Sequence, residues 1–200
     1  MTEVITLTLK PHPRETDLGD KRKVTLRLME PSDRDRIVEF ARALPPDDLL
    51  FLRKDITNPA VVDGWVRDLK AGLVQTVLAE ADGELVGYGS LWLEETLWGR
   101  HMGEIRALVR PDYRGAGLGY KLVSDVFAIA RYLGVNKIIA RVTRAQERTR
   151  ARLERIGFRQ GAVLHDFVLD RDGKPHDLIV MSTDAGHLTD AQQRAAWVRS

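Results

Sequence analysis

The chain has 200 residues, 44% of them hydrophobic and 30% charged, and this composition indicates one globular domain with a sizeable core. A net charge of +2 is too small for a general nucleic-acid binder, and the absence of cysteine excludes disulfides, thiolate metal ligands and a cysteine nucleophile. The sequence contains neither a membrane-spanning apolar run nor a secretory leader pattern, so we expect a cytoplasmic protein that binds neither nucleic acid nor membrane.

The first seventy residues follow the patterns of two strands and two amphipathic helices. Pro31-Ser32-Asp33 is a helix start, and Pro45-Pro46 ends that helix. Residues 11–19 are polar and predict a connection without regular structure. The strands are accordingly expected at 4–9 and 24–29, and the helices at 31–44 and 59–71.

The rest of the chain predicts two hairpins around two strand-helix units. Asp82-Gly83 between two alternating runs is a strong hairpin signal, and residues 171–174 form a second such turn. These patterns together predict a mixed α/β sheet. In chain order the elements are strands 74–80 and 85–93, strand 105–109, helix 118–133, strand 137–142, helix 147–156, and strands 162–169 and 177–182.

The most informative segment joins the strand at 105–109 to the helix that follows it. The joining turn is Arg114-Gly115-Ala116-Gly117-Leu118-Gly119. Its three glycines let backbone N–H groups converge on an anion, and the positive end of the helix dipole adds to the same place. The spacings of the P-loop and of the dinucleotide-binding turn are both absent. The turn therefore predicts a phosphate site, with an ordinary tight connection as the alternative.

In this context the turn resembles the Arg/Gln-x-x-Gly-x-Gly/Ala signature of the GNAT acyltransferase superfamily. Arg114, Gly117 and Gly119 match the signature and follow a strand that ends in Val-x-Pro, as the family's strand does. The order of elements is similar to that of the family from Lys23 to Thr183. The resemblance implies a central, mostly antiparallel sheet of about seven strands with helices on both faces.

The resemblance also implies a division of the chain into a core and two appendages. The acetyltransferase domain is expected at 23–183, after an extension over 1–22 that holds an extra strand. A tail over 184–200 is expected to form a short helix from Thr189.

Acetyl-CoA is the acyl donor that the resemblance implies. The backbone of Leu108 and Val109 would hold its pantetheine arm like an added strand, where a bulge splays this strand from the one at 137–142. Gln146 stands where many members have an Asn that contacts the cofactor. No metal is expected, because five scattered histidines and no cysteine make no ligand pattern. The pyrophosphate would lie on Arg114, Gly115, Ala116, Gly117, Leu118 and Gly119, with Tyr120 in the first helical turn.

Transfer to an amine requires a base, since an alkyl amine is almost fully protonated at pH 7, at a cost of roughly 4 to 5 kcal/mol. Glu104, on the strand that lines the acyl end of the cofactor, is the first candidate, and His101 is the second. A solvated surface role is the alternative for each. Leu153 stands where many members have a Tyr that protonates the leaving thiolate, so that proton would come from water or another group.

We therefore expect an N-acetyltransferase that moves an acetyl group from acetyl-CoA to a primary amine, on a small molecule or a protein, by direct attack in a ternary complex. The alternative is a catalytically weak regulatory module that binds acyl-CoA, and a homodimer is left open. The segment from Trp92 to Trp98, which contains Glu94 and Glu95, either packs ordinarily or forms one wall of a pocket that attracts a cationic amine. The arginines over 141–159 either form a solvated face or meet the 3′-phosphate of coenzyme A.

Overall fold

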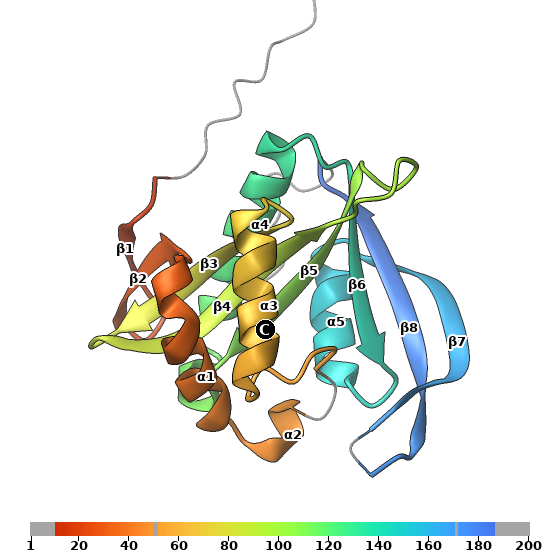
Figure 1. Cartoon of the computed structure of the whole chain (residues 1–200), viewed down its shortest axis with the longest axis horizontal. Helices are drawn as coiled ribbons and strands as arrows, with labels where there is room; N and C mark the ends of the chain where they lie inside the picture. Colours follow the sequence, from red (N-terminus) through yellow and green to blue (C-terminus); the bar gives the residue numbers. More distant parts are fainter. Residues whose placement is uncertain (1–10, 50–51, 171, 187–200) are drawn as a thin grey trace, which may run out of the picture.

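The computed structural model describes residues 11–49, 52–170 and 172–186, which form one eight-stranded sheet with helices on both faces (Figure 1). The strand order is β1-β2-β3-β4-β5-β6-β8-β7, and all neighbouring strands are antiparallel except β5 and β6. Helices α1 and α3 cover one face, and α4 and α5 cover the other. The arrangement confirms the mixed α/β fold predicted from the sequence.

The described elements have the following bounds. The strands are β1 (Arg14–Asp17), β2 (Lys23–Leu28), β3 (Val74–Ala81), β4 (Glu84–Leu93), β5 (Met102–Val109), β6 (Lys137–Thr143), β7 (Arg159–Leu169) and β8 (Pro175–Asp184). The α-helices are α1 (Arg34–Arg42), α2 (Pro46–Leu49), α3 (Pro59–Lys70), α4 (Leu118–Tyr132) and α5 (Glu147–Arg155), with short 3₁₀ turns at Pro31–Asp33 and Pro111–Tyr113. Within the described residues, no helix combines the length and hydropathy that crossing a membrane needs.

Helix α4 forms as its sequence predicts, because apolar residues recur at helical spacing and a glycine follows the last turn. Gly134 has a φ of +75°, the left-handed conformation that ends many helices. Its N–H donates to the carbonyl of Arg131, and the N–H of Val135 donates to that of Ala130. The Asp82-Gly83 hairpin is confirmed likewise, with φ values of +51° and +81° that suit a two-residue turn.

Two short elements differ from the sequence prediction. The polar connection expected over 11–19 contains β1, which has no apolar alternation and forms because it pairs with β2 and is tied to α4. Arg14 donates to both oxygens of the buried Asp125 carboxylate at 2.5 Å, and His12 contacts the same carboxylate at 3.0 Å. Helix α2 occupies part of the loop expected after Pro45, and it begins at a proline, which suits a first helical turn.

Two other expected elements fall outside the described residues. These are the strand at 4–9 and the tail helix from Thr189. Each remains a prediction from the sequence.

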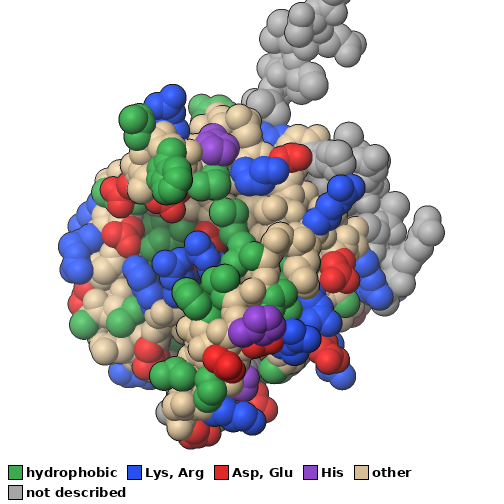
Figure 2. Space-filling view, turned by 90° about the vertical axis from the view of Figure 1, so that its right-hand side faces the viewer, with side chains coloured by type: hydrophobic (Ala, Val, Ile, Leu, Met, Phe, Trp, Pro, Cys, Tyr) green, Lys and Arg blue, Asp and Glu red, His purple; other side chains and the backbone are tan. Residues whose placement is uncertain are grey.

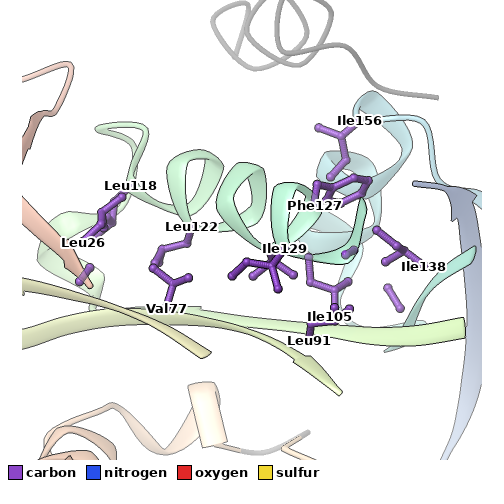
Figure 3. Packing of buried hydrophobic residues seen from close by; sticks show 14 of the residues in the cluster. Leu26, Val77, Leu91, Ile105, Leu118, Leu122, Phe127, Ile129, Ile138 and Ile156 are labelled. Carbon is purple, nitrogen blue, oxygen red and sulfur yellow. The ribbon is translucent and has the colours of Figure 1, made fainter. Parts of the chain in front are cut away.

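The core has two layers, one on each face of the sheet. In Figure 3, Leu122 of α4 points toward the sheet near Val77, whereas Phe127 lies beside Ile156, next to α5. The second layer, under α1 and α3, contains Phe40, Trp65 and Tyr88. Successive residues of a strand point to opposite faces of the sheet. Ile105 of β5 therefore points into the α4 layer, whereas Glu104 and Arg106 point to the face that α1 and α3 cover.

Strands β5 and β6 part soon after they begin. Their parallel ladder consists of three pairs and ends at Glu104 and Ile139. The β4–β5 ladder continues without a register shift as far as Val109, so no bulge in this ladder causes the parting, in contrast to the expectation. The second half of β5 therefore has an edge to which no described strand is paired.

A network of four charged side chains joins α1 to the sheet. Arg27 on β2 donates two hydrogen bonds to Asp33, at 2.5 and 2.7 Å, and two to Glu80, at 2.6 and 3.0 Å. Arg36 on α1 also contacts Glu80, at 2.5 Å. Burial is the largest single influence and would raise the pKa of Asp33 and of Glu80, but the hydrogen bonds and charges of Arg27 and Arg36, with the Glu30 N–H on Asp33, together outweigh it and hold each pKa below its usual value.

Replacing the arginine at the centre of this network should destabilise the fold. We expect Arg27→Leu to lower the free energy of unfolding by about 3 kcal/mol at pH 7, because two largely buried carboxylates lose their main partner. Since the folded pKa values are lowered, this stabilisation is complete above the ordinary carboxyl pKa near ~4 and is lost as pH falls below it. Denaturant unfolding at pH 7 and pH 3 measures both effects.

The matched control is Arg34→Leu, which removes an arginine that pairs with Asp35 and Asp63, two carboxylates far more exposed than Asp33 and Glu80. It should change stability far less. A gap between wild type and Arg27→Leu that is equally wide at pH 3 and pH 7 would contradict the assignment.

Candidate functional site

The unpaired edge of β5 offers backbone groups to a ligand. The N–H of Arg110 donates to the carbonyl of Val86 at 2.9 Å, so alternation along the strand turns the backbone groups of Leu108 toward β4 and those of Val109 toward the open edge. Ala107, two residues before Val109, has the same orientation as Val109. An extended ligand at this edge would therefore meet Ala107 and Val109, with Leu108 packing its side chain between them on the α3 face.

The glycine-rich turn has the conformation that an anion site needs. Gly115 and Gly117 have φ values of +79° and +89°, and a Cβ added to either would meet no atom within 4 Å. The turn is therefore open on the side where the glycines lack a side chain. Gly117 is also the N-cap of α4, so the backbone N–H groups at the start of the helix face this end of it.

Arg114 is held at the mouth of this turn by two contacts. Its Nε donates to the carbonyl of Val109 at 2.9 Å, and its Nη2 donates to the carboxylate of Asp48 at 2.6 Å. The side chain thereby links the end of β5, the turn and helix α2. The residues expected to bind a pyrophosphate lie together: Arg114, Gly115, Ala116, Gly117, Leu118 and Gly119 are consecutive, and Tyr120 follows in the first turn of α4.

Gln146 lies at the N-cap of α5, at the end of β6. Its amide oxygen accepts the N–H of Thr143 at 2.9 Å, which closes the turn between strand and helix. The amide nitrogen is the part of this side chain that would donate to a ligand. Leu153, on the same helix, packs against the α4 core and has no proton to donate.

On the other face of the sheet, two adjoining pockets form what we call the cleft pocket. Their empty volumes are about 350 and 760 Å³, including solvent at the mouths. On the face drawn in Figure 2, Lys and Arg side chains lie across a hollow lined by hydrophobic side chains. Both pockets are lined by Arg53, Lys54, Trp92 and Arg106, and the larger one also by Glu104 and Arg141.

Glu104 occupies the point where β5 and β6 part, and three arginines converge on it. Arg53, from the loop before α3, donates to its carboxylate at 2.6 Å. Arg141 of β6 contacts the same oxygen, and the Nε of Arg106 lies 3.4 Å from the other. The carboxylate is thus directed into the cleft pocket and is occupied by guanidinium donors.

Trp92 forms an aromatic wall of the cleft pocket. The Arg106 guanidinium lies 4.4 Å from the centre of its ring, and the Lys54 ammonium lies 4.8 Å from it. Its indole N–H donates to the hydroxyl of Ser90 at 2.9 Å. This ring is therefore fixed by packing and by a hydrogen bond, and it carries two cations.

The other expected pocket residues are arranged differently. Trp98 is 86% exposed, and Glu94 and Glu95, although they line the larger pocket, are exposed as well. His101 is exposed before β5 and is not among the described residues that line the cleft pocket. The lining of the cleft pocket contains four cationic residues (Arg53, Lys54, Arg106 and Arg141) and four acidic ones (Asp68, Glu94, Glu95 and Glu104), and three of the cations converge on Glu104.

Sequence reasoning missed the arginines around Glu104. Arg106 lies two residues beyond Glu104, so period-2 alternation places it on the same face of β5. Arg141 lies two residues beyond Ile139, the partner of Glu104 across the parallel ladder. The placement of Arg106 follows from the sequence alone, whereas that of Arg141 requires the pairing register of β5 and β6. The position of Arg53 depends on a loop that no local pattern specifies.

Comparison with known proteins gives a family match and a curated relative. Residues 33–158 match the model of the acetyltransferase (GNAT) family. The glucosamine 6-phosphate N-acetyltransferase of Trypanosoma brucei brucei is 37% identical over 94 residues, which are 45% of this chain. The matched part spans 62% of that enzyme, less than two thirds of its length.

Solved structures share the fold over most of their length. The protein yncA from Salmonella typhimurium, described as an acetyltransferase with its cofactor acetyl-CoA, has a TM-score of 0.69 and 21% identity, and the match covers 83% of this chain and 96% of that one. A phosphinothricin acetyltransferase from Sinorhizobium meliloti, in complex with acetyl-CoA, has a TM-score of 0.70 and 21% identity, with 83% and 90% covered. At these identities the likeness establishes a common fold.

The buried tyrosine in the cleft pocket should keep its proton in alkaline solution. Burial raises the pKa of Tyr88 to about 12, and the nearby charge of Arg106 offsets only part of this rise. We expect the difference in phenolate absorbance between wild type and Tyr88→Phe to be close to zero at pH 10.5, where an ordinary tyrosine is more than half ionised. A difference titration with a midpoint near ~10 would show instead that the hydroxyl is solvated.

Proposed function

The chain belongs to the acetyltransferase (GNAT) family, and on that premise we propose that it transfers an acetyl group from acetyl-CoA to a primary amine in a ternary complex. Membership makes it an acyltransferase. The observation that carries the finer proposal is the free edge of β5, which runs from Glu104 to the anion turn at the start of α4. We place the reaction in the cytoplasm, and the acceptor on a small molecule or a protein.

The residues present fit an acyl-CoA along this edge. The backbone groups of Val109 suit the amides of a pantetheine arm, and the open turn at Gly115 and Gly117 suits a pyrophosphate. Two relatives of the same fold are described with acetyl-CoA, which supports the same donor here. Tyr120 follows the anion turn in the first turn of α4, and Gln146 follows the end of β6, the parallel strand that parts from β5.

Acetyl-CoA supplies a thioester whose carbonyl carbon accepts the amine. In the reaction the C–N bond would form and the C–S bond would break. The nitrogen would lose two protons, one to the base and one to solvent, and the leaving thiolate would take one proton from water. The N–H of Val109 is free to donate to the thioester oxygen as negative charge develops on it. Binding both substrates at once avoids a covalent enzyme intermediate, in agreement with the absence of cysteine.

Glu104 is the residue that we propose as the base. It lies on the α3 side of β5, in the cleft pocket, beside the point where the free edge begins. There it would take the proton that the attacking ammonium must lose, directly or through a water. His101, the second candidate from the sequence, lies outside this pocket.

The proposal is tested by thiol release in the presence of acetyl-CoA and a panel of amines. The chain has no cysteine, so free thiol reports coenzyme A alone. We expect release to require an amine and to fall about a hundredfold in Glu104→Gln, whose remaining activity should rise with pH toward the pKa of the amine. Glu154→Gln, an exposed change on α5, is the matched control.

Two outcomes would contradict this proposal. Acetyl-CoA binding without release for any amine would favour the regulatory module. Release that is equal in Glu104→Gln and wild type at every pH would place the base elsewhere.

A glycine pair separates coenzyme A binding from simple backbone strain. Gly117 in the anion turn and Gly83 in the β3–β4 hairpin have φ values of +89° and +81°, and neither has atoms near its missing Cβ. We expect both alanine variants to lose roughly 1 to 2 kcal/mol of stability. Gly117→Ala alone should weaken acetyl-CoA binding, by about tenfold in calorimetric titration, because strain displaces the N–H groups that face the phosphates. Equal affinities in the two variants would contradict the assignment of the turn.

A further inference from the structure

We propose that the amine acceptor carries an anionic group, a phosphate or a carboxylate, and that Arg106 binds it in the cleft pocket. The inference rests on the proposed function and names the chemical class of its acceptor. Three observations support it: the positive charge around Glu104, the two terminal nitrogens of Arg106, which have no partner among the described residues, and the distance between Arg106 and Glu104 along β5.

The charges around Glu104 do not balance. Arg53, Arg106 and Arg141 contact this one carboxylate, which leaves two positive charges uncompensated by it. Lys54, the other cation of the pocket, has its own partner in Asp68, at 3.5 Å. The two remaining acidic residues of the lining, Glu94 and Glu95, are exposed and form no ion pair with these arginines within the described residues. The excess beside Glu104 is therefore positive, and it would attract a negatively charged group of the acceptor.

Arg106 has the atoms that recognition of an anion requires. Its only hydrogen bond within the described residues is made by Nε, at 3.4 Å, so neither terminal nitrogen has a partner there. The side chain is 20% exposed, and its plane is held against Trp92. An arginine oriented in this way, with both terminal nitrogens free, suits bidentate binding of a carboxylate or phosphate.

The spacing of Arg106 and Glu104 sets the size of the acceptor. Residues two apart on one face of a strand lie roughly 7 Å apart. An acceptor that places its nitrogen at Glu104 and its anion at Arg106 would therefore separate these groups by a few ångströms, as in an amino-sugar phosphate or an amino acid. The aromatic wall and the apolar residues of the smaller pocket would cover the carbon skeleton between them.

The same contacts explain how Glu104 could act as a base although arginines occupy it. An incoming anion offers the guanidiniums a second acceptor and competes with Glu104 for their N–H groups. Carboxylate oxygens of Glu104 released in this way can accept the proton of the ammonium. The anionic group of the acceptor would thus take the place of the Glu104 carboxylate as the hydrogen-bond acceptor of the guanidinium groups.

The test compares acceptors that differ in charge but keep the same amine. Glucosamine 6-phosphate against glucosamine forms the phosphate arm, and methionine against methioninol, whose amine has a similar basicity, forms the carboxylate arm. We expect kcat/KM for thiol release to favour the charged member by about tenfold or more in at least one arm. The arm with the larger ratio identifies the anion.

The assignment to Arg106 is tested with Arg106→Gln, Arg106→Lys and Arg155→Gln. Arg155 is exposed at the end of α5, so the last change removes the same charge far from the pocket. The charged-to-neutral ratio should fall about tenfold in Arg106→Gln, fall less in Arg106→Lys, and stay unchanged in Arg155→Gln. As a readout that does not depend on turnover, the NMR signal of the Arg106 Nε–H should shift when glucosamine 6-phosphate is added and not when glucosamine is added.

The possible failures are distinguishable. Release that does not distinguish charged from neutral acceptors would overturn this inference and leave the proposed function standing. A preference for charged acceptors that Arg106→Gln retains, with a silent Arg106 signal, would assign the anion to other residues and overturn the role of Arg106. No release with any acceptor of either charge would overturn the proposed function and this inference together.

Discussion

The parting of β5 from β6 is the constraint on which the rest of the site depends. Three pairs of a parallel ladder hold the strands together, and beyond Glu104 and Ile139 each continues alone. A strand edge inside a sheet is costly unless its N–H and C=O groups find partners. The fold therefore leaves an open strand edge, along which we propose that the donor binds, and this edge leads to the glycine-rich turn at the start of α4.

In our proposal the free edge of β5 binds the donor, and the α3 face of β5 binds the acceptor. The edge of β5 and the turn at Gly117 lie along the path of the donor, whereas its α3 face presents Glu104 and Arg106 to the cleft pocket. Period-2 alternation keeps Ile105 in the α4 core, so the strand that carries the reactive groups is anchored by its own buried residues. Rigid support of this kind is what a site needs in order to hold reacting groups in position.

The sequence predicted the elements with strong local signals and missed those set by distant partners. The Asp82-Gly83 turn and the α4 boundaries follow from residues within a few positions. In contrast, β1 has no apolar pattern and is specified by pairing with β2 and by the buried Asp125 on α4. Arg53 and Arg141 were missed for the same reason, because they come from segments far from Glu104 in the chain, whereas alternation along β5 could have placed Arg106 beside Glu104.

The distances along the chain between these charges have a consequence for folding. Arg53 lies 51 residues before Glu104 and Arg141 lies 37 residues after it. Contacts of such separation form only after the chain has paid the entropy of closing the loops between them. The cleft pocket should therefore be completed late, after the crossover through α4 has brought β6 beside β5. A nascent chain that has not yet synthesised β6 lacks one guanidinium of the cluster and the strand that positions it, so acceptor recognition is a property of the finished fold and of no fragment that ends before it.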